Sequence, residues 1–205
     1  MSLDIRPAKP GDALIAAALL AETTGEFGVH VLGLGSPELE FKALQLWFED
    51  KANRFSYEVA SIAEMYGMAA GVLLAFEGRI LERLTLGCGK RMFKIYSPAG
   101  TLKMLWRNLS LANNREAEND EYLIAHLAVS EDFRRQGVGQ ALLEKAAQDA
   151  RTAHIKKLVL EVEIENHKAI ALYRKAGFET VKTFLFKSPA ASFISPGFHK
   201  MLKVL

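Results

Sequence analysis

The sequence has little of several features that mark particular protein classes. It holds one cysteine in 205 residues, Cys88, so no disulfide can form within the chain, which suits a reducing compartment. The 26 basic residues nearly balance the 24 acidic ones, and the net charge of +2 provides no concentrated basic field for nucleic acid. The apolar stretch at residues 13–21 is shorter than the roughly 20 residues that span a bilayer. We expect neither a nucleic-acid nor a membrane partner.

The sequence also lacks signals for secretion, for a cysteine nucleophile and for a metal site. Asp4, Arg6 and Lys9 precede any apolar run, so we see no secretory signal and expect a cytoplasmic protein. Cys88 lies between two glycines and is interpreted as a loop residue rather than a nucleophile. The histidines show no ligand spacing, so no metal site is predicted; they are His30, His126, His154, His167 and His199.

The first half of the chain predicts strands and helices in alternation. Asp12 is a candidate N-cap for a helix over residues 13–22, and residues 25–35 are predicted to be a loop. Ser36 is predicted to cap a second helix with Pro37 at its first position. A strand is predicted at residues 3–6, and a hairpin with strands at 57–64 and 70–76. The segment 79–120 is predicted to be a helical excursion between two strands. The whole chain, 1–205, is predicted to be a single domain with a helical insertion at about 86–120.

The second half has a clearer pattern. The run 122–129 is almost entirely apolar, as expected of a strand that is buried on both faces. A helix is predicted over 137–155, and a second over 167–176 that ends at Gly177. The remaining strands are predicted at residues 157–165, 178–187 and 198–205. Alternating strands and helices predict an α/β fold around a mixed sheet.

The connection between the apolar strand and the first of these helices is the most informative segment. Gly137 and Gly139 open the helix, where unpaired backbone N–H groups and the helix dipole favour a phosphate group. Arg134 and Arg135 add positive charge. Leu142 stands where a dinucleotide fingerprint has its third glycine, and no P-loop lysine follows. Taken alone, the two glycines also fit a tight strand-to-helix connection.

The segment resembles the acyl-CoA pyrophosphate motif of the GNAT superfamily of N-acetyltransferases, R/Q-x-x-G-x-G/A. Arg134, Gly137 and Gly139 fill that motif. A second run looks like the family's strand-loop-helix segment and contains Asn166, Ala169, Leu172, Tyr173, Gly177 and Phe178. The resemblance covers residues 121–180, whereas the N-terminal half matches only in the order of its elements.

The resemblance implies the GNAT fold, a mixed central sheet splayed between its fourth and fifth strands with helices on both faces. It implies acetyl-CoA as co-substrate, wedged in the split, with the backbone of Leu127 and Val129 bonding the pantetheine arm and Val129 N–H facing the thioester oxygen. The cofactor-binding residues implied are Leu127, Ala128, Val129, Arg134, Arg135, Gln136, Gly137, Val138, Gly139, Gln140, Asn166, Ala169 and Tyr173.

Two proton transfers accompany acetyl transfer to an amine. Tyr173 matches the family's tyrosine that faces the thioester sulfur; the alternative is an aromatic packing residue. Glu161 occupies the place of the base in the similar ribosomal-protein N-terminal alanine acetyltransferases, but Glu161, Glu163 and Glu165 also fit the polar face of a strand. His126 is a weaker base, because strand alternation places Ala125 and Leu127 on one side and His126 on the other. A water chain is the remaining alternative.

The predicted function is direct transfer of an acetyl group to a primary amine in a ternary complex. The alternatives are a protein N-terminal or lysine acetyltransferase, which the similarity around Glu161 favours, and a non-catalytic acyl-CoA sensor. The acceptor site is expected at residues 27–47 and at the 188–198 connection, where Phe193, Pro196 and Phe198 hint at an uncharged or aliphatic acceptor. An exposed C-terminal strand predicts a homodimer.

Overall fold

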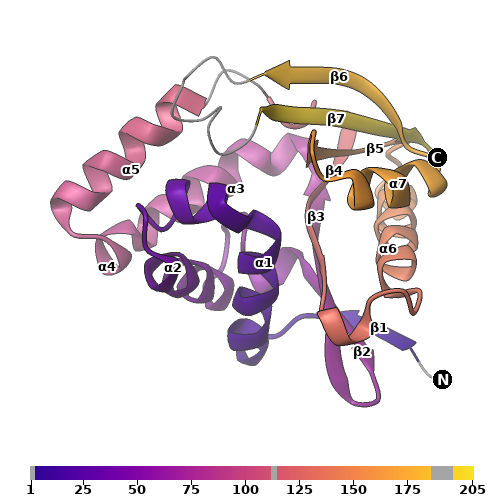
Figure 1. Ribbon diagram of the computed structural model, residues 1–205, viewed down its shortest axis with the longest axis horizontal. Coiled ribbons are helices and arrows are strands. Elements are labelled where there is room, and N and C mark those ends of the chain that lie inside the picture. Colours follow the sequence, from indigo (N-terminus) through magenta and orange to yellow (C-terminus); the bar gives the residue numbers. More distant parts are fainter. Residues whose placement is uncertain (1–2, 112–114, 186–195) are drawn as a thin grey trace.

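The computed structural model describes residues 3–111, 115–185 and 196–205 of the chain. Seven strands form one mixed sheet in the order β1-β2-β3-β4-β5-β7-β6. Helices lie on both faces of this sheet (Figure 1). The strands are β1 Leu3–Pro7, β2 Ala60–Met65, β3 Met68–Glu77, β4 Glu121–Val129, β5 Lys157–Glu163, β6 Glu179–Leu185 and β7 Gly197–Val204. The predicted α/β fold with a mixed sheet is therefore confirmed.

The β2–β3 hairpin forms around a two-residue turn. Tyr66 and Gly67 both have positive φ, 55° and 76°, which is the backbone twist that joins two antiparallel strands tightly. The predicted hairpin is correct, but its first strand begins later than expected. Tyr57–Val59 is a turn of 3-10 helix, and the strand begins at Ala60.

Helices α1, Ala13–Val31, and α2, Pro37–Glu49, cover one face of the sheet. Ser36 Oγ accepts a hydrogen bond from Leu39 N at 3.1 Å, so the predicted cap of α2 is confirmed. The predicted loop at 25–35 is wrong, because α1 continues to Val31 through a kink where Gly25 has φ 50°. Asp12 makes no side-chain cap for α1; its carboxylate instead binds Arg6 through two 2.8 Å hydrogen bonds.

Helix α1 is longer than the helix predicted over residues 13–22. Together with the turn before it, Pro10–Val31 is 22 residues long and meets the length and composition of a membrane span, the one segment to do so in the described ranges. In this fold Ala16, Ala17 and Leu20 are fully buried and belong to the core cluster between the sheet and α2.

Three helices connect β3 to β4, where a helical excursion was predicted. They are α3 Leu81–Cys88, α4 Met92–Ile95 and α5 Pro98–Leu111, and they lie beside α1 and α2 (Figure 1). Helix α3 begins before residue 86. Cys88 ends this helix and is buried, so its assignment to a loop was wrong.

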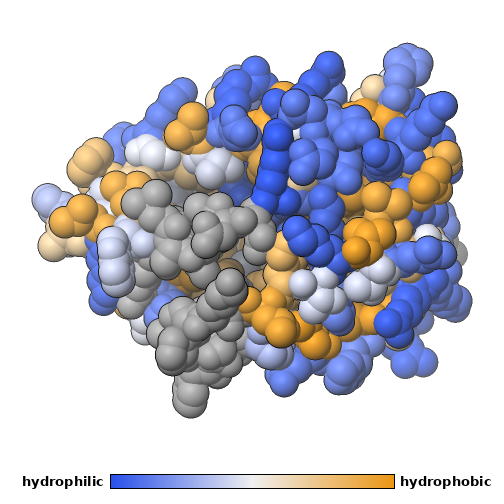
Figure 2. Space-filling view, turned by 90° about the horizontal axis from the view of Figure 1, so that it is seen from above, coloured by the Kyte–Doolittle hydropathy of each residue, from blue (hydrophilic) through white to orange (hydrophobic). Residues whose placement is uncertain are grey.

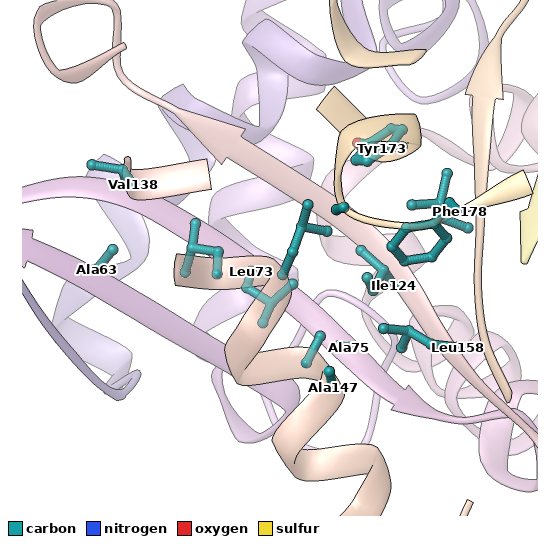
Figure 3. Packing of buried hydrophobic residues seen from close by; sticks show 14 of the residues in the cluster. Ala63, Leu73, Ala75, Ile124, Val138, Ala147, Leu158, Tyr173 and Phe178 are labelled. Carbon is teal, nitrogen blue, oxygen red and sulfur yellow. The ribbon is translucent and has the colours of Figure 1, made fainter. Parts of the chain in front are cut away.

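Helices α6, Val138–Thr152, and α7, His167–Lys175, cover the opposite face. Their apolar residues and those of β3, β4 and β5 form one core cluster. Figure 3 shows Ala147 of α6 close to Ala75 of β3, and Tyr173 of α7 above the sheet near Phe178. Gly177, with φ 89°, ends α7 as predicted.

Strands β4 and β5 run parallel but pair over only part of their length. The paired residues extend from Glu121 with Lys157 to Ile124 with Leu160. Beyond this point β4 stays paired with β3 and β5 with β7, so the sheet splits between its fourth and fifth strands. The predicted splay is confirmed. Strand β5 ends at Glu163, two residues earlier than predicted.

The C-terminal strand is not at the edge of the sheet. Strand β7 lies between β5 and β6 and pairs with both, so it cannot form the dimer contact that was predicted for it. The outer strand is β6, and most of its residues are exposed.

Candidate active site

A large cleft passes through the split between β4 and β5. It encloses about 1980 Å³ and is lined by residues of both sheet faces, including those at the free ends of the two strands. Ligand sites for drug-sized molecules commonly occupy roughly 300–1,000 Å³, so this cleft has room for two reactants at once. Glu161 and Tyr173 both line it, although the sequence separates them and they lie on different elements.

The N-terminus of α6 opens on this cleft and forms a cofactor cradle, defined here as residues 134–140. Gly137 is the N-cap residue, with φ 87°, a left-handed conformation that a residue with a Cβ adopts only at a cost. The hydrogen bond from Ala141 N to Gly137 O, at 3.0 Å, closes the first helical turn. Val138, Gly139 and Gln140 precede the first helical hydrogen bond and line the cleft. Backbone N–H groups at such a helix N-terminus are suited to binding a phosphate.

Arg134 connects the cradle to its surroundings. Its guanidinium binds Glu131 at 2.7 Å and Glu22 of α1 at 3.1 Å, and its Nε donates to Val129 O at 3.2 Å. The predicted phosphate-binding cation is thus paired with two carboxylates. Arg135 also lines the cleft, and it has φ 66°, an unusual value outside glycine.

The structure brings nearly all of the predicted cofactor-binding residues to the cleft. Asn166 both lines it and caps α7, because its Oδ1 accepts a hydrogen bond from Ala169 N at 3.1 Å. Gln136 is the exception: it is absent from the lining, and its side-chain amide donates to Asp132 O at 2.9 Å. The predicted residues in the lining are Leu127, Ala128, Val129, Arg134, Arg135, Gly137, Val138, Gly139, Gln140, Asn166, Ala169 and Tyr173.

Tyr173 packs in the core on the α6 and α7 face, with 8% of its surface exposed. Burial raises the pKa of its hydroxyl to about 12. At neutral pH the phenol therefore keeps its proton, as a general acid must. Tyr173 also packs against Phe178, with ring centroids 6.0 Å apart. Its packing role and its place in the cleft are compatible.

Strand β4 contains a β-bulge that changes which side chains share a face. His126 pairs with Leu74 while Ile124 pairs with Ala75, which leaves Ala125 as the extra residue. Ala125 therefore packs on the α1 and α2 face, whereas Leu127 packs on the α6 and α7 face. The predicted grouping of Ala125 with Leu127 is wrong, because simple alternation does not hold across a bulge.

His126 faces the α1 and α2 side of the cleft. Its ring stacks on Phe55 with centroids 5.4 Å apart. Burial and the nearby Arg54 guanidinium lower the pKa of His126 to about 4, partly opposed by Glu116. The imidazole is neutral at pH 7 and is a weak base.

Glu161 and Glu163 of β5 both line the cleft, and burial raises the pKa of each. Oε1 of Glu161 is fully buried and has no hydrogen-bond partner among the described residues, whereas Glu165 is exposed. Burial, reinforced by the charge of Glu116, raises the pKa of Glu161 to about 7, against the lowering effects of Lys200 and Arg54. A carboxyl group with a pKa near 7 is chemically suited to general base catalysis.

An ion pair that the sequence did not suggest lies in the same part of the cleft. The Arg54 guanidinium donates two hydrogen bonds to the Glu116 carboxylate, at 2.7 and 2.6 Å. Their side chains are 17% and 31% exposed. Burial alone would raise the pKa of Glu116, but the Arg54 guanidinium outweighs this and holds it below its ordinary value. Glu116 lies within the predicted helical excursion, and no local pattern indicated this pairing.

Cys88 also lines the cleft, near Trp47, whose indole N–H donates to Cys88 O at 3.0 Å. Burial raises the pKa of its thiol, although Arg54 opposes the shift. The thiol is protonated at neutral pH, which argues against a nucleophilic role for Cys88. Within residues 3–111, 115–185 and 196–205, no group of three or more His, Cys, Asp or Glu side chains could hold a metal ion.

The split mixed sheet with helices on both faces is a GNAT-type fold, and a glycine-containing helix N-terminus and Tyr173 lie at its cleft. Residues 87–178 match the acetyltransferase (GNAT) family. The resemblance seen in the sequence is confirmed.

Comparisons with known proteins agree. The chain is 42% identical over 59 residues to the [ribosomal protein bS18]-alanine N-acetyltransferase of Escherichia coli (strain K12), which covers 29% of this chain and 40% of that protein. An N-acetyltransferase structure from Staphylococcus aureus Mu50 superposes with a TM-score of 0.73 at 20% identity, covering 97% of this chain and 99% of that one. A PaiA N-acetyltransferase of Thermoplasma acidophilum in complex with coenzyme A gives 0.54 at 12% identity and full coverage of both chains. The chain spans between 26% and 40% of the first curated relatives' length.

Proposed function

We propose that the protein is an acetyl-CoA-dependent N-acetyltransferase that transfers the acetyl group directly to a primary amine. The observation that carries this proposal is the split between β4 and β5, which places the N-terminus of α6, Tyr173 and Glu161 around one cleft. A binding site for a long cofactor and two groups suited to proton transfer thereby share a single cavity.

The residues present fit coenzyme A. The cofactor cradle offers backbone N–H groups and the positive end of a 15-residue helix to the diphosphate. The edge of β4 beyond Ile124 is not paired with β5, so its backbone is open to the pantetheine arm as to an added strand. The PaiA N-acetyltransferase with this fold was crystallised with coenzyme A, which supports the assignment.

Glu161 and Tyr173 supply the two proton transfers. Glu161 takes a proton from the ammonium, and the free amine nitrogen attacks the thioester carbonyl carbon. The C–N bond forms and the C–S bond breaks, and the Tyr173 hydroxyl donates its proton to the departing thiolate. The second proton of the nitrogen returns through solvent to Tyr173, and Glu161 releases the first to solvent. One proton is released for each amide formed. Val129 N–H is the proposed donor to the thioester oxygen.

A second candidate is acetylation of a protein N-terminus or lysine. The 42% identity to the bS18-alanine N-acetyltransferase favours it, since that protein acts on a ribosomal protein's alanine. A non-catalytic acyl-CoA sensor is disfavoured, because a binder does not need a carboxylate whose pKa lies near 7. The lone cysteine supports a cytoplasmic location for the enzyme.

Tyr173→Phe tests the assigned acid. We expect turnover to fall by roughly 10²–10⁴-fold, the usual contribution of one acid–base group, while acetyl-CoA affinity stays within about twofold. Steady-state thiol release and calorimetric titration with acetyl-CoA measure the two quantities.

Tyr122→Phe is the matched control, because Tyr122 is also 8% exposed and packs in the same core cluster but does not line the cleft. Both variants lose one buried hydroxyl, so equal effects on turnover would mean that Tyr173 acts only through packing. Full turnover in Tyr173→Phe would remove the acid altogether.

A further inference from the structure

The cleft continues past the split into a part that we term the acceptor chamber, defined by Val31, Leu32, Phe55, Met92, Met104 and Leu105. Several of these residues belong to the core cluster on the α1 and α2 face, whereas the cofactor cradle and Tyr173 belong to the α6 and α7 face. The two reactants can therefore approach the split from opposite sides of the sheet.

The walls of this chamber are apolar, and Arg54 and Glu116 beside it form an ion pair that leaves Arg54 Nε buried without a partner among the described residues. Both terminal nitrogens of the Arg54 guanidinium bind the Glu116 carboxylate, so neither charge is available to a ligand without breaking the pair. His126 stacks on Phe55 and is neutral at pH 7, since its pKa is lowered to about 4 by burial and by Arg54. At this end of the cleft one buried carboxylate oxygen in the described part of the chain lacks a partner: Oε1 of Glu161.

We propose that the acceptor is a monoamine whose single ammonium sits at Glu161 and whose uncharged body, an alkyl or arylalkyl group, fills the acceptor chamber. This inference rests on the proposed acetyl transfer and names its substrate class. The match is the buried Glu161 carboxylate for the ammonium, with Phe55, Met92 and Met104 around the remainder of the substrate. Glu163, the next acidic residue along β5, also lines the cleft.

The same walls discriminate against other amines. Inside the acceptor chamber a diamine would bury its second ammonium among apolar side chains, because Glu116 is held by Arg54. A peptide would bring backbone N–H and C=O groups against the same apolar side chains. Each additional methylene of an alkylamine instead moves from water into contact with the apolar wall, which stabilises the bound amine.

The chamber extends to exposed side chains of α3 and α5. Leu86 and Leu105 line the cleft there, and both are exposed. Hydrophobic side chains are visible on the end of the molecule formed by α5, at the left in Figure 2. An extended alkyl chain can therefore run from Glu161 toward this rim, where Leu105 contacts its far end.

The test compares acceptors with the full chain and acetyl-CoA. Primary n-alkylamines from butyl to octyl, phenethylamine, the α,ω-diamines of equal length and a short peptide beginning with alanine are assayed by thiol release. We expect kcat/KM to rise about threefold to fourfold per methylene. Each diamine should be at least tenfold worse than the monoamine of equal length.

A charge placed at the rim sharpens the test. Leu105→Glu should reverse the preference, so that the diamine long enough to reach it exceeds the monoamine. Leu105 is 47% exposed, which makes the variant tolerable to the fold. Leu102→Glu is the control, since Leu102 is 70% exposed on the same helix and does not line the cleft; it should leave the preference unchanged.

The possible failures are distinguishable. A kcat/KM that is independent of chain length, or higher for the peptide than for octylamine, overturns the acceptor class and leaves acetyl transfer intact. Reversal by Leu102→Glu as well as Leu105→Glu also overturns it, because the effect would then be general surface charge. Absence of acetyl-CoA binding in calorimetry overturns both this inference and the proposed function.

Discussion

The two ends of the cleft are built in different ways. The cofactor end comes from a nearly continuous stretch, in which β4, the cofactor cradle and the first turn of α6 follow one another within residues 127–140. The acceptor end brings together Arg54, Glu116, His126 and Glu161, which come from four separate segments. A function encoded by adjacent residues leaves a sequence motif. A function assembled by packing leaves none, and its charges can be understood only in the fold.

Glu161→Gln should have the largest effect, and it probes the acceptor end alone. We expect kcat to fall by roughly 10²–10⁴-fold, because the neutral amide cannot take the ammonium proton. In the parent protein kcat should rise with pH through about 7, the pKa of Glu161, and level off above it. A pH–rate profile and calorimetric titration with acetyl-CoA check both points.

Stability provides a second measure of the same carboxyl. Burial raises the pKa of Glu161 in the folded state to about 7 from its ordinary value of 4.5. The stability linked to this proton is present below pH 4.5 and is lost as the pH rises through 7. Glu161→Gln should remove that part of the pH dependence of unfolding. If the rising limb near pH 7 persists in the variant, the base is a group other than Glu161, such as a water chain.

Glu116→Gln should have the next largest effect. It leaves the Arg54 guanidinium without its ion-pair partner, at an expected cost of about 1–3 kcal/mol in the free energy of unfolding. It also removes a negative charge that raises the pKa of Glu161, so the rising limb of the pH–rate profile should move to lower pH.

Asp120→Asn is the control for that prediction. Asp120 pairs with Lys157 at 2.8 Å on the surface, and such pairs contribute about 0–1 kcal/mol. If the rising limb of the pH–rate profile stays in place in Glu116→Gln, the Arg54–Glu116 pair supports the fold and does not set the pKa of Glu161.

Gly137→Ala probes the cofactor end, with a smaller effect. Gly137 has φ +87°, and a Cβ there meets no atom within 4 Å, so the cost is backbone strain of about 1–2 kcal/mol. The distorted turn should also raise the KM for acetyl-CoA several-fold.

Gly67→Ala in the β2–β3 hairpin is the matched control, since φ is +76° and the space is equally open. Both variants should lose similar stability in urea unfolding, but only Gly137→Ala should change the KM for acetyl-CoA. An unchanged KM in both would argue that no cofactor lies against this turn.

Glu22→Gln should have the smallest effect. Glu22 and Arg134 are half-exposed, and releasing Arg134 from this carboxylate makes its charge more available to a diphosphate. We expect the KM for acetyl-CoA to fall by about twofold, an effect that diminishes at high salt. An increase in KM would show that Glu22 positions Arg134 rather than competing with the cofactor.

Much of the second half of the fold could be predicted from the sequence. The apolar run of β4, the glycine at the start of α6 and Gly177 after α7 each reflect a local rule of burial or backbone conformation. The errors arose where tertiary context overrode the local rule. Gly25 was expected to end a helix, but packing on the sheet carries α1 through it to Val31.

The site shows the same division. The sequence by itself determined the cofactor end, since the cofactor cradle needs only adjacent residues with the right φ angles and free N–H groups. Only the tertiary structure decided the acceptor end. The bulge at Ala125 sets the face of His126, and packing holds Arg54 against Glu116. The pKa of Glu161 then depends on burial and on charges from distant segments, because electrostatic energies follow distance in space rather than along the chain.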